Sequence, residues 1–296
     1  MKLAPIAMFV YKRPQHALRT IEALKRNDLA AASDLIVVSD GPKTEDDRVL
    51  VDKVRADVAR TDGFRSVTLV ERECNYGLAE SIISGVTDIV NTHGRIIVLE
   101  DDMVTSPYFL RYMNEALDLY ENDEDVISIH GYVYPVKGRL PETFFLRGAD
   151  CWGWATWKRG WALFEPDGGK LLIELKEQHL EREFDFNGAY PYTTMLRNQI
   201  GGRNDSWAIR WYASAFLKNK LTLYPGTSLV HNIGLDASGT HCGNISAFDA
   251  QLAVVPVYLE KIAVKEDKNA RAFMALSLSS SCSLLKRIWR MLWGWS

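Results

Sequence analysis

The stretch Ile96-Ile97-Val98-Leu99-Glu100-Asp101-Asp102-Met103 decides the fold of this chain of 296 residues. Its apolar first half is typical of a buried strand, and three carboxylates follow it directly. Adjacent carboxylates repel one another unless a cation lies among them. Mg²⁺ and Mn²⁺ take oxygen ligands, often one or two carboxylates together with substrate phosphates, and ligands of open α/β sheets bind beyond the carboxyl ends of strands. The stretch therefore predicts a site for a divalent cation and a phosphate, with a solvated acidic turn as the alternative.

Apolar strands and amphipathic helices alternate on the amino-terminal side of this stretch. The hydrophobic pattern predicts strands at 3–11, 35–38, 67–70 and 96–99, and helices at 15–26, 45–60 and 77–90. Such alternation predicts a parallel sheet with right-handed crossovers. No GxGxxG motif follows the first strand and no P-loop occurs, which disfavours a dinucleotide-binding domain.

The second half of the chain is less regular and rich in aromatic residues. Its pattern predicts helices at 107–121, at 170–183 and from Trp207 onward, and strands at 126–129 and 221–225. The tryptophan-rich stretch 151–161 lies between them. Large aromatic side chains are usually core, although their faces also stack on the C–H faces of sugars, so both roles stay open.

The composition is that of an ordinary globular protein. The chain is 47% hydrophobic and 25% charged, and its net charge of −3 does not favour binding to nucleic acid. The four cysteines form no CxxC pair, so no zinc site is expected. With no signal peptide at the amino terminus, a cytoplasmic location is expected. No apolar run reaches the roughly 18 residues of a membrane-spanning helix.

Six short pieces of the chain, taken in their order and spacing, resemble glycosyltransferases of the GT-A fold, in particular family-2-like bacterial enzymes. The pieces are Phe9-Val10-Tyr11-Lys12-Arg13-Pro14, Val38-Ser39-Asp40-Gly41, Asn75-Tyr76-Gly77-Leu78, Leu99-Glu100-Asp101-Asp102, Gly153-Trp154-Ala155-Thr156-Trp157 and Asn204-Asp205-Ser206-Trp207. The Glu-Asp-Asp triplet is similar to that of eukaryotic N-acetylglucosaminyltransferase I. The resemblance implies a Rossmann-like, mostly parallel central sheet flanked by helices.

The resemblance also implies a division of the chain. Residues 1–245 correspond to a catalytic domain, in which 1–103 form the half that binds the nucleotide sugar and 104–245 the half that binds the acceptor. Residues 246–296 form a C-terminal extension.

The resemblance implies roles for the matching residues. Those that match donor-binding positions are Ala7, Phe9, Tyr11, Arg13, Asp40, Asn75, Gly77, Glu100 and Asp101. Those that match metal positions are Asp102 and, in the late glycine-rich segment, His231 or His241, with Mn²⁺ or Mg²⁺ as the cofactor. Asp205 matches the general base, and Trp152 and Trp154 are candidates for acceptor binding.

Each of these roles has a plainer alternative. Asp205 precedes an expected helix, where aspartate often serves as the N-cap. Asp40 precedes Gly41-Pro42, where aspartate often forms a turn. The two histidines suit hydrogen-bonded positions as well as metal ligation. The residues alone leave these alternatives open.

The activity that the resemblance implies is metal-dependent, inverting transfer of a hexosyl or N-acetylhexosaminyl group. The donor is a nucleotide sugar, with UDP expected, and the acceptor is a glycan or lipid-linked glycan in surface glycan synthesis. One rival function is a sugar-nucleotide nucleotidyltransferase, although Tyr11-Lys12-Arg13-Pro14 lacks the glycines of a triphosphate loop. The other is a non-catalytic, membrane-associated sugar-binding module.

The carboxyl-terminal residues 284–296, LLKRIWRMLWGWS, have the pattern of a basic amphipathic helix. Apolar residues share one helical face, while Lys286, Arg287 and Arg290 lie mainly on the other. Such a helix suits an anionic membrane surface. The pattern therefore predicts peripheral association with the inner face of the cell membrane, with packing against the catalytic domain or a second subunit as the alternative.

Overall fold

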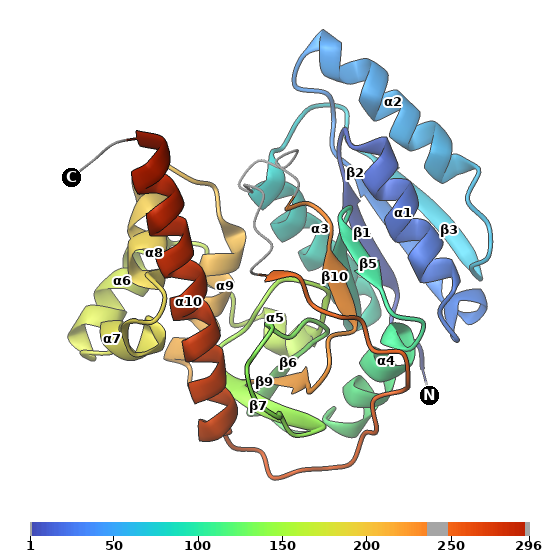
Figure 1. Cartoon of the computed structure of the whole chain (residues 1–296). Helices are drawn as coiled ribbons and strands as arrows, with labels where there is room; N and C mark the ends of the chain where they lie inside the picture. The colour runs from blue at the N-terminus through green and yellow to red at the C-terminus, as the bar shows by residue number, and fades with distance from the viewer. Residues whose placement is uncertain (1, 236–247, 294–296) are drawn as a thin grey trace.

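The computed structural model of the chain describes residues 2–235 and 248–293. Figure 1 shows a large central sheet with helices on both of its faces. The sheet has eight strands in the order β3-β2-β1-β4-β8-β6-β9-β7, and a separate pair, β10-β5, lies beside it. The chain thus has the mixed α/β architecture that its hydrophobic pattern predicts.

The first hundred residues confirm the predicted alternation of strands and helices. The elements are β1 (Ile6–Val10), α1 (Pro14–Lys25), the 3₁₀ turn η1 (Ala30–Ala32), β2 (Asp34–Ser39), α2 (Glu45–Ala59), β3 (Ser66–Glu71), α3 (Leu78–His93) and β4 (Arg95–Glu100). Pro14 begins α1, where its missing N–H costs no hydrogen bond. All four strands pair in parallel, so their carboxyl ends meet at one edge of the sheet.

The second half of the chain adds short strands and helices. They are β5 (Met103–Thr105), α4 (Phe109–Leu119), β6 (Val126–His130), β7 (Thr143–Arg147), β8 (Trp154–Trp157), α5 (Lys158–Trp161), α6 (Gly168–Glu177), α7 (Glu181–Phe184), η2 (Phe186–Gly188), α8 (Tyr192–Ile200), α9 (Trp207–Leu217), β9 (Leu221–Pro225), β10 (Val230–Asn232) and α10 (Lys268–Trp293). Strand β8 lies antiparallel between β4 and β6, whereas β6 and β9 are parallel. The sheet is therefore mixed.

The sequence pattern missed several of these elements. Strands β5, β7, β8 and β10 were not expected, and the helix predicted at 170–183 is divided in two. Helix α6 ends at Glu177 because His179 takes a left-handed conformation, with φ of 55°, which turns the chain before α7. Helix α10 also begins earlier than expected, at Lys268 instead of residue 284.

Two apolar layers enclose the sheet. Helices α1, α2 and α4 cover one face, where Ile21, Val54 and Met113 belong to the same buried cluster as Met8 of β1. Helices α3, α5 and α9 cover the other face, and their core is continuous with Trp154 of β8. The helices cover the two faces of the sheet, so the polar residues at the carboxyl ends of the strands lie at its edge.

Helix α10 packs against the second half of the chain through its first turns. Ala270, Met274 and Leu278 are buried in one cluster with Phe144 and Phe216. The Ser277 hydroxyl donates a hydrogen bond to the Pro135 carbonyl over 2.6 Å. Among the described residues, none of the helices combines the length and the apolarity that crossing a membrane requires.

Candidate functional site

The acidic triplet lies at the carboxyl end of β4, beside the end of β1. Glu100 is the last residue of the strand and pairs with Phe9, while Asp101 and Asp102 turn the chain into β5. Asp101 and Asp102 are only 4% and 7% exposed. This burial excludes the alternative of a solvated acidic turn.

Arg13, just beyond the end of β1, is the ion-pair partner of the triplet. Its guanidinium donates to Asp102 Oδ2 over 2.7 Å through Nη2, and through Nε and Nη2 to the two oxygens of Asp101. Burial alone would lower the pKa of Arg13, but the charges and hydrogen bonds of the two aspartates raise it above its usual value. Arg13 therefore stays charged and holds both carboxylates.

The single charge of Arg13 does not balance the negative charges of the three carboxylates. Burial raises the pKa of Glu100 to about 8, and the charges of Asp102 and Asp101 add to the shift. Burial also raises the pKa of Asp101 to about 6, against the opposing charge of Arg13. A divalent cation would favour the ionised forms of both groups.

Asp102 has the atom best suited to a cation. Its Oδ1 is buried and has no hydrogen-bond partner among the described residues. Gly234 closes the other side, since a methyl group at its Cα would lie 2.1 Å from Asp102 Oδ2. No three acidic, histidine or cysteine side chains in the described ranges converge as a ready-made ligand set.

His231 lies beside the triplet on β10. It pairs with Val104 of β5, and the next residues return to the triplet, where the Ile233 N–H donates to the Asp102 carbonyl over 2.9 Å. The ring Nδ1 of His231 lies 3.3 Å from the Ala250 carbonyl. The second candidate, His241, lies outside the described residues. The structure thus brings one of the two histidines to this end of the sheet.

Asp40, at the end of β2, organises the loop that precedes α3. Its carboxylate accepts hydrogen bonds from the backbone N–H groups of Gly41, Tyr76 and Gly77 and from the side-chain amide of Asn75, over 2.8–3.0 Å. A carboxylate offers about four acceptor positions, so the chain itself occupies the acceptor capacity of Asp40. In this structure the residue holds a loop, and the predicted contact with the nucleotide base would need one of these bonds to be shared.

Glycine is required where this loop meets β2. A methyl group at the Gly41 Cα would lie 2.4 Å from the carbonyl carbon of Cys74. Gly77 has a positive φ of 78° and immediately precedes α3. The backbone of the loop therefore lies close to the end of β2, at the edge of the sheet.

Asp205, two residues before α9, lies close to this same loop. A methyl group at the Gly77 Cα would lie 3.8 Å from Asp205 Oδ2. The Asp205 side chain is 64% exposed, and its nearest cation is Arg210, with Nη2 3.9 Å from Oδ1. Helix α9 is capped by Ser206, whose hydroxyl accepts from the Ile209 N–H. The N-cap alternative for Asp205 is therefore excluded, and its carboxylate faces solvent.

Ala7 and Phe9 occupy the core below the site. They are 0% and 5% exposed, and Phe9 packs against α3, where a methyl group at Gly85 would lie 2.6 Å from its ring. Their side chains support the sheet, and the predicted contact of these two positions with the donor stays a prediction. Tyr11 lies nearer the surface, and its hydroxyl donates to Asp47 Oδ2 over 2.9 Å.

The two tryptophans expected to bind the acceptor differ in their exposure. Trp154 is 0% exposed and packs between Trp207 and Trp211, so it cannot stack on a ligand, because its neighbours in the core cover the ring. Trp152 stays partly exposed, next to Tyr132 and Phe248. The core alternative therefore holds for Trp154.

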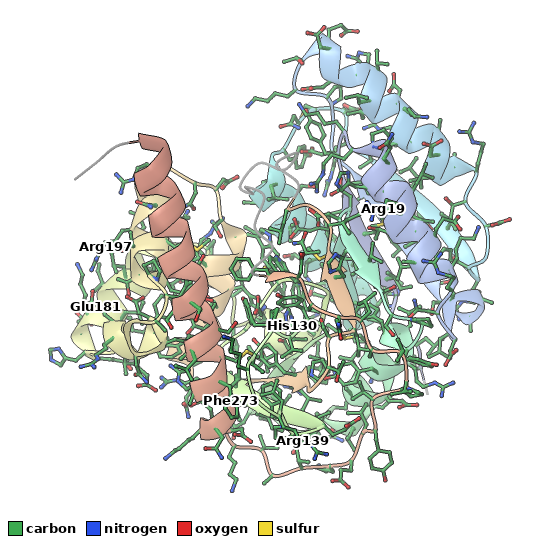
Figure 2. All side chains as sticks on the ribbon, in the orientation of Figure 1. Arg19, His130, Arg139, Glu181, Arg197 and Phe273 are labelled. Atoms are coloured by element: carbon green, nitrogen blue, oxygen red, sulfur yellow. The ribbon has the colours of Figure 1, made fainter. Side chains whose placement is uncertain are left out.

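The sequence reasoning missed Asp150, which directly precedes this aromatic stretch. Its carboxylate accepts from the Tyr134 hydroxyl over 3.2 Å and from the Cys151 N–H over 2.8 Å. Oδ2 also lies 3.6 Å from Nε2 of His130, an interior side chain (Figure 2) whose pKa is lowered by burial. Its position next to Cys151-Trp152 was the available signal.

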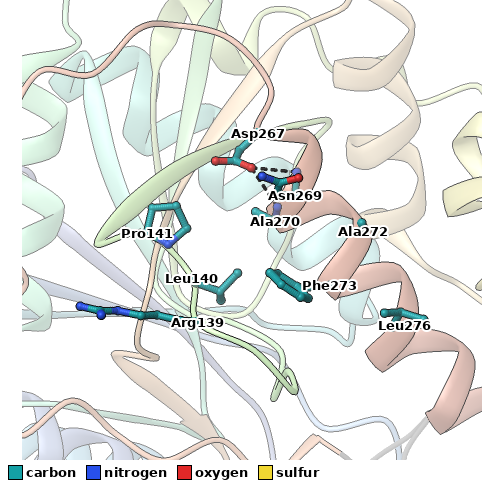
Figure 3. Close-up of a pocket in the computed structure, with 9 residues that line it drawn as sticks. All are labelled: Arg139, Leu140, Pro141, Asp267, Asn269, Ala270, Ala272, Phe273 and Leu276. Atoms are coloured by element: carbon teal, nitrogen blue, oxygen red, sulfur yellow. Dashed lines mark hydrogen bonds between the residues drawn. The ribbon is translucent and has the colours of Figure 1, made fainter.

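A separate cavity of about 510 Å³ lies between residues 139–141 and the start of α10. Figure 3 shows Leu140, Pro141 and Phe273 lining it, with Asp267 and Asn269 at one end. None of the residues assigned to the site above lines this cavity.

Comparisons with known proteins give structural likenesses at low identity. No protein-family model matches the chain, and a search of curated proteins found no match. A solved mannosyltransferase from Pyrobaculum calidifontis, in complex with GDP-Man and Mn²⁺, is 14% identical over 46% of this chain and 37% of its own, with a TM-score of 0.34.

Two solved structures of TarS from S. aureus are also similar. One is 13% identical over 49% of this chain and 24% of its own, with a TM-score of 0.32. The other, of residues 1–349, is 12% identical over 77% of this chain and 60% of its own, with a TM-score of 0.42. In all three cases the chain spans less than two thirds of its neighbour's length, and similarity at this level assigns no activity to it.

Proposed function

We propose that the chain is a metal-dependent glycosyltransferase of the GT-A fold that uses a nucleotide-sugar donor, with UDP as the expected carrier. The observation that carries this proposal is the buried, unpartnered Oδ1 of Asp102 at the carboxyl end of β4. A buried carboxylate oxygen without a partner is costly unless a ligand completes it. It lies at the edge of the sheet where α/β folds bind their ligands.

The residues present fit a divalent cation with oxygen ligands. Asp102 would hold it, with His231 as the candidate additional ligand. Mn²⁺ or Mg²⁺ suits this donor set. When bound, such a cation stabilises negative charge on a leaving diphosphate as a Lewis acid.

Asp205 is the proposed general base. In the reaction, an acceptor hydroxyl oxygen bonds to the anomeric carbon, the bond from that carbon to the diphosphate oxygen breaks with its electron pair, and the hydroxyl proton passes to the Asp205 carboxylate. The exposed side chain beside Gly77 suits this role, since it faces solvent from which an acceptor arrives. Attack opposite the leaving group inverts the anomeric configuration.

The proposed acceptor is a glycan or lipid-linked glycan, with Trp152 as its stacking surface. Trp152 is the partly exposed tryptophan of this stretch, and Tyr132 and Phe248 fix its ring. Trp152→Ala is expected to raise the KM for the acceptor with little change in donor affinity. An unchanged acceptor KM would remove this residue from the proposal.

Association with an anionic membrane surface is proposed for the C-terminal segment. Helix α10 is anchored by its first turns, and Figure 1 shows its carboxyl end at the same end of the view as the start of α3. Deleting 284–296 should abolish co-sedimentation with anionic liposomes, and persistent co-sedimentation would assign the segment to packing.

The first test of the proposed function is thermal stabilisation by UDP, GDP, dTDP and their common sugars, each with Mn²⁺ and with EDTA. A ligand at about 100 times its Kd adds roughly 2.7 kcal/mol of stability. A shift with one nucleotide sugar that EDTA removes is expected. Stabilisation by a nucleoside triphosphate with a sugar phosphate would favour a nucleotidyltransferase, and response to sugars alone a binding module.

A further inference from the structure

The Arg13 guanidinium lies against the acidic triplet, directly beside the carboxylate proposed to hold the cation. Nη2 donates to Asp102 Oδ2 over 2.7 Å and also contacts Asp101 Oδ1, while Nε lies 3.3 Å from Asp101 Oδ2. The Arg13 side chain is 21% exposed, against 6% and 10% for the two carboxylates. The pair is thus largely shielded from water, where charge interactions are strong.

The same carboxylate cannot serve Arg13 and a divalent cation equally well. A cation that binds the free Oδ1 of Asp102 lies next to Oδ2, which accepts from Arg13, and therefore close to the positive charge of the guanidinium. Arg13 compensates one of the three carboxylates when all are ionised, and His16 is the other basic group whose charge acts on Asp101. A cation alone therefore binds Asp102 against the repulsion of the Arg13 charge.

A diphosphate would remove this conflict. Its negative oxygens can accept from Arg13 and ligate the cation at the same time, because guanidinium groups bind phosphate readily. Arg13 precedes α1 at the end of β1, next to β4, so it lies at the edge of the sheet where the donor would bind.

We propose that Arg13 is an internal counter-cation that makes cation binding and diphosphate binding depend on one another. In the free protein it holds Asp101 and Asp102 in place and lowers their affinity for a cation. When cation and nucleotide diphosphate bind together, Arg13 exchanges its Asp102 bond for the diphosphate. This inference rests on the proposed function, and it makes Arg13 a positioning residue that links two ligands.

Calorimetry of the full chain tests the proposal. Mn²⁺ is titrated without nucleotide and in saturating UDP, and UDP is titrated with and without Mn²⁺. For the wild-type chain, UDP should tighten Mn²⁺ binding about tenfold or more, and Mn²⁺ should tighten UDP binding by the same factor, within the usual range for coupled sites.

Arg13→Gln should tighten the binding of Mn²⁺ alone about tenfold and bring the coupling factor close to one. Arg19→Gln is the matched control: Arg19 is exposed on α1, the helix that follows Arg13 (Figure 2), and its replacement removes the same charge away from the triplet. Arg19→Gln should bind Mn²⁺ and UDP as the wild type does.

The result that overturns the proposal is an Arg13→Gln chain that binds Mn²⁺ alone no more tightly than the wild type, or that keeps the wild-type coupling factor. If Arg13→Gln does not fold, Arg13→Lys replaces it and should show a smaller change in the same direction; no change there has the same meaning. The titration with Mn²⁺ alone tests the role of Arg13 independently of nucleotide binding. If the wild-type chain binds no nucleotide at all, that result contradicts the proposed function instead.

Discussion

Two acidic strand ends of the same sheet differ in how their carboxylates are satisfied. Asp40, after β2, accepts four hydrogen bonds, all from its own chain. The triplet after β4 shares one guanidinium, that of Arg13, and leaves Asp102 Oδ1 without a partner among the described residues. The strands are separated only by β1, about 10 Å at the usual strand spacing.

Asp40 holds the structure of the site, whereas the carboxylates of the triplet still have capacity to bind a ligand. A buried acid whose acceptor positions are filled by backbone N–H groups stabilises a conformation. A buried acid that remains incomplete in the folded chain is a candidate for ligand binding. On this basis Asp40 positions the loop at 75–77, while Asp102 is the group with capacity for a cation.

Asp102→Asn should have the largest effect on function. It removes the charge that the proposed cation needs, so metal-dependent UDP binding should be lost and transfer should fall about a thousandfold, equivalent to several kcal/mol. Calorimetry with Mn²⁺ and UDP, followed by a transfer assay, measures both. Asp88→Asn, at an exposed position of α3, is the control for the same chemical change. Unchanged Mn²⁺-dependent affinity would move the cation away from Asp102.

Asp205→Asn should lose transfer and keep donor binding. A general base contributes about a hundredfold to ten-thousandfold in rate, and none of the residues proposed to hold the cation or the donor depends on a hydrogen bond to the Asp205 side chain among the described residues. Single-turnover rates and UDP calorimetry distinguish the two quantities. A variant that still transfers at the wild-type rate would place the base elsewhere, with Asp150 as the next carboxylate to replace.

Asp40→Asn should act on stability more than Asp102→Asn does. The Tyr76 and Gly77 N–H groups donate to the two oxygens of Asp40. Asparagine replaces one of these oxygens by an NH₂ donor, so one N–H group loses its acceptor, which lowers the free energy of unfolding by about 2 kcal/mol. Chemical denaturation in EDTA measures both variants without a cation. A larger loss for Asp102→Asn than for Asp40→Asn would reverse the contrast between the two strand ends.

Asn75→Ala should have the smallest effect in this set. It removes one of the four bonds to Asp40 and the bond to the Gly41 carbonyl, at a cost of about 1 kcal/mol. The same denaturation experiment measures it. A cost equal to that of Asp40→Asn would mean that the side chain of Asn75, and not the backbone N–H groups, holds the loop.

The sequence predicted the elements whose hydrophobic period is long and regular. Strands β1 to β4 and helices α1 to α3 occur where their patterns place them, and their parallel order follows from the alternation. The short strands β7 and β8 were missed because a segment of four or five residues, three of them apolar, does not distinguish a strand from a loop. They exist because β4, β6 and β9 offer them hydrogen bonds.

The sequence by itself determined which residues stand at the strand ends, since a buried strand followed by three acids is a local pattern. Only the tertiary structure decided what each acid meets: Arg13 for Asp101 and Asp102, four donors for Asp40, and Gly77 for Asp205. These partners come from segments far apart in the chain. Local periodicity fixes the elements, but the ligands of a carboxylate are fixed only when distant segments pack together.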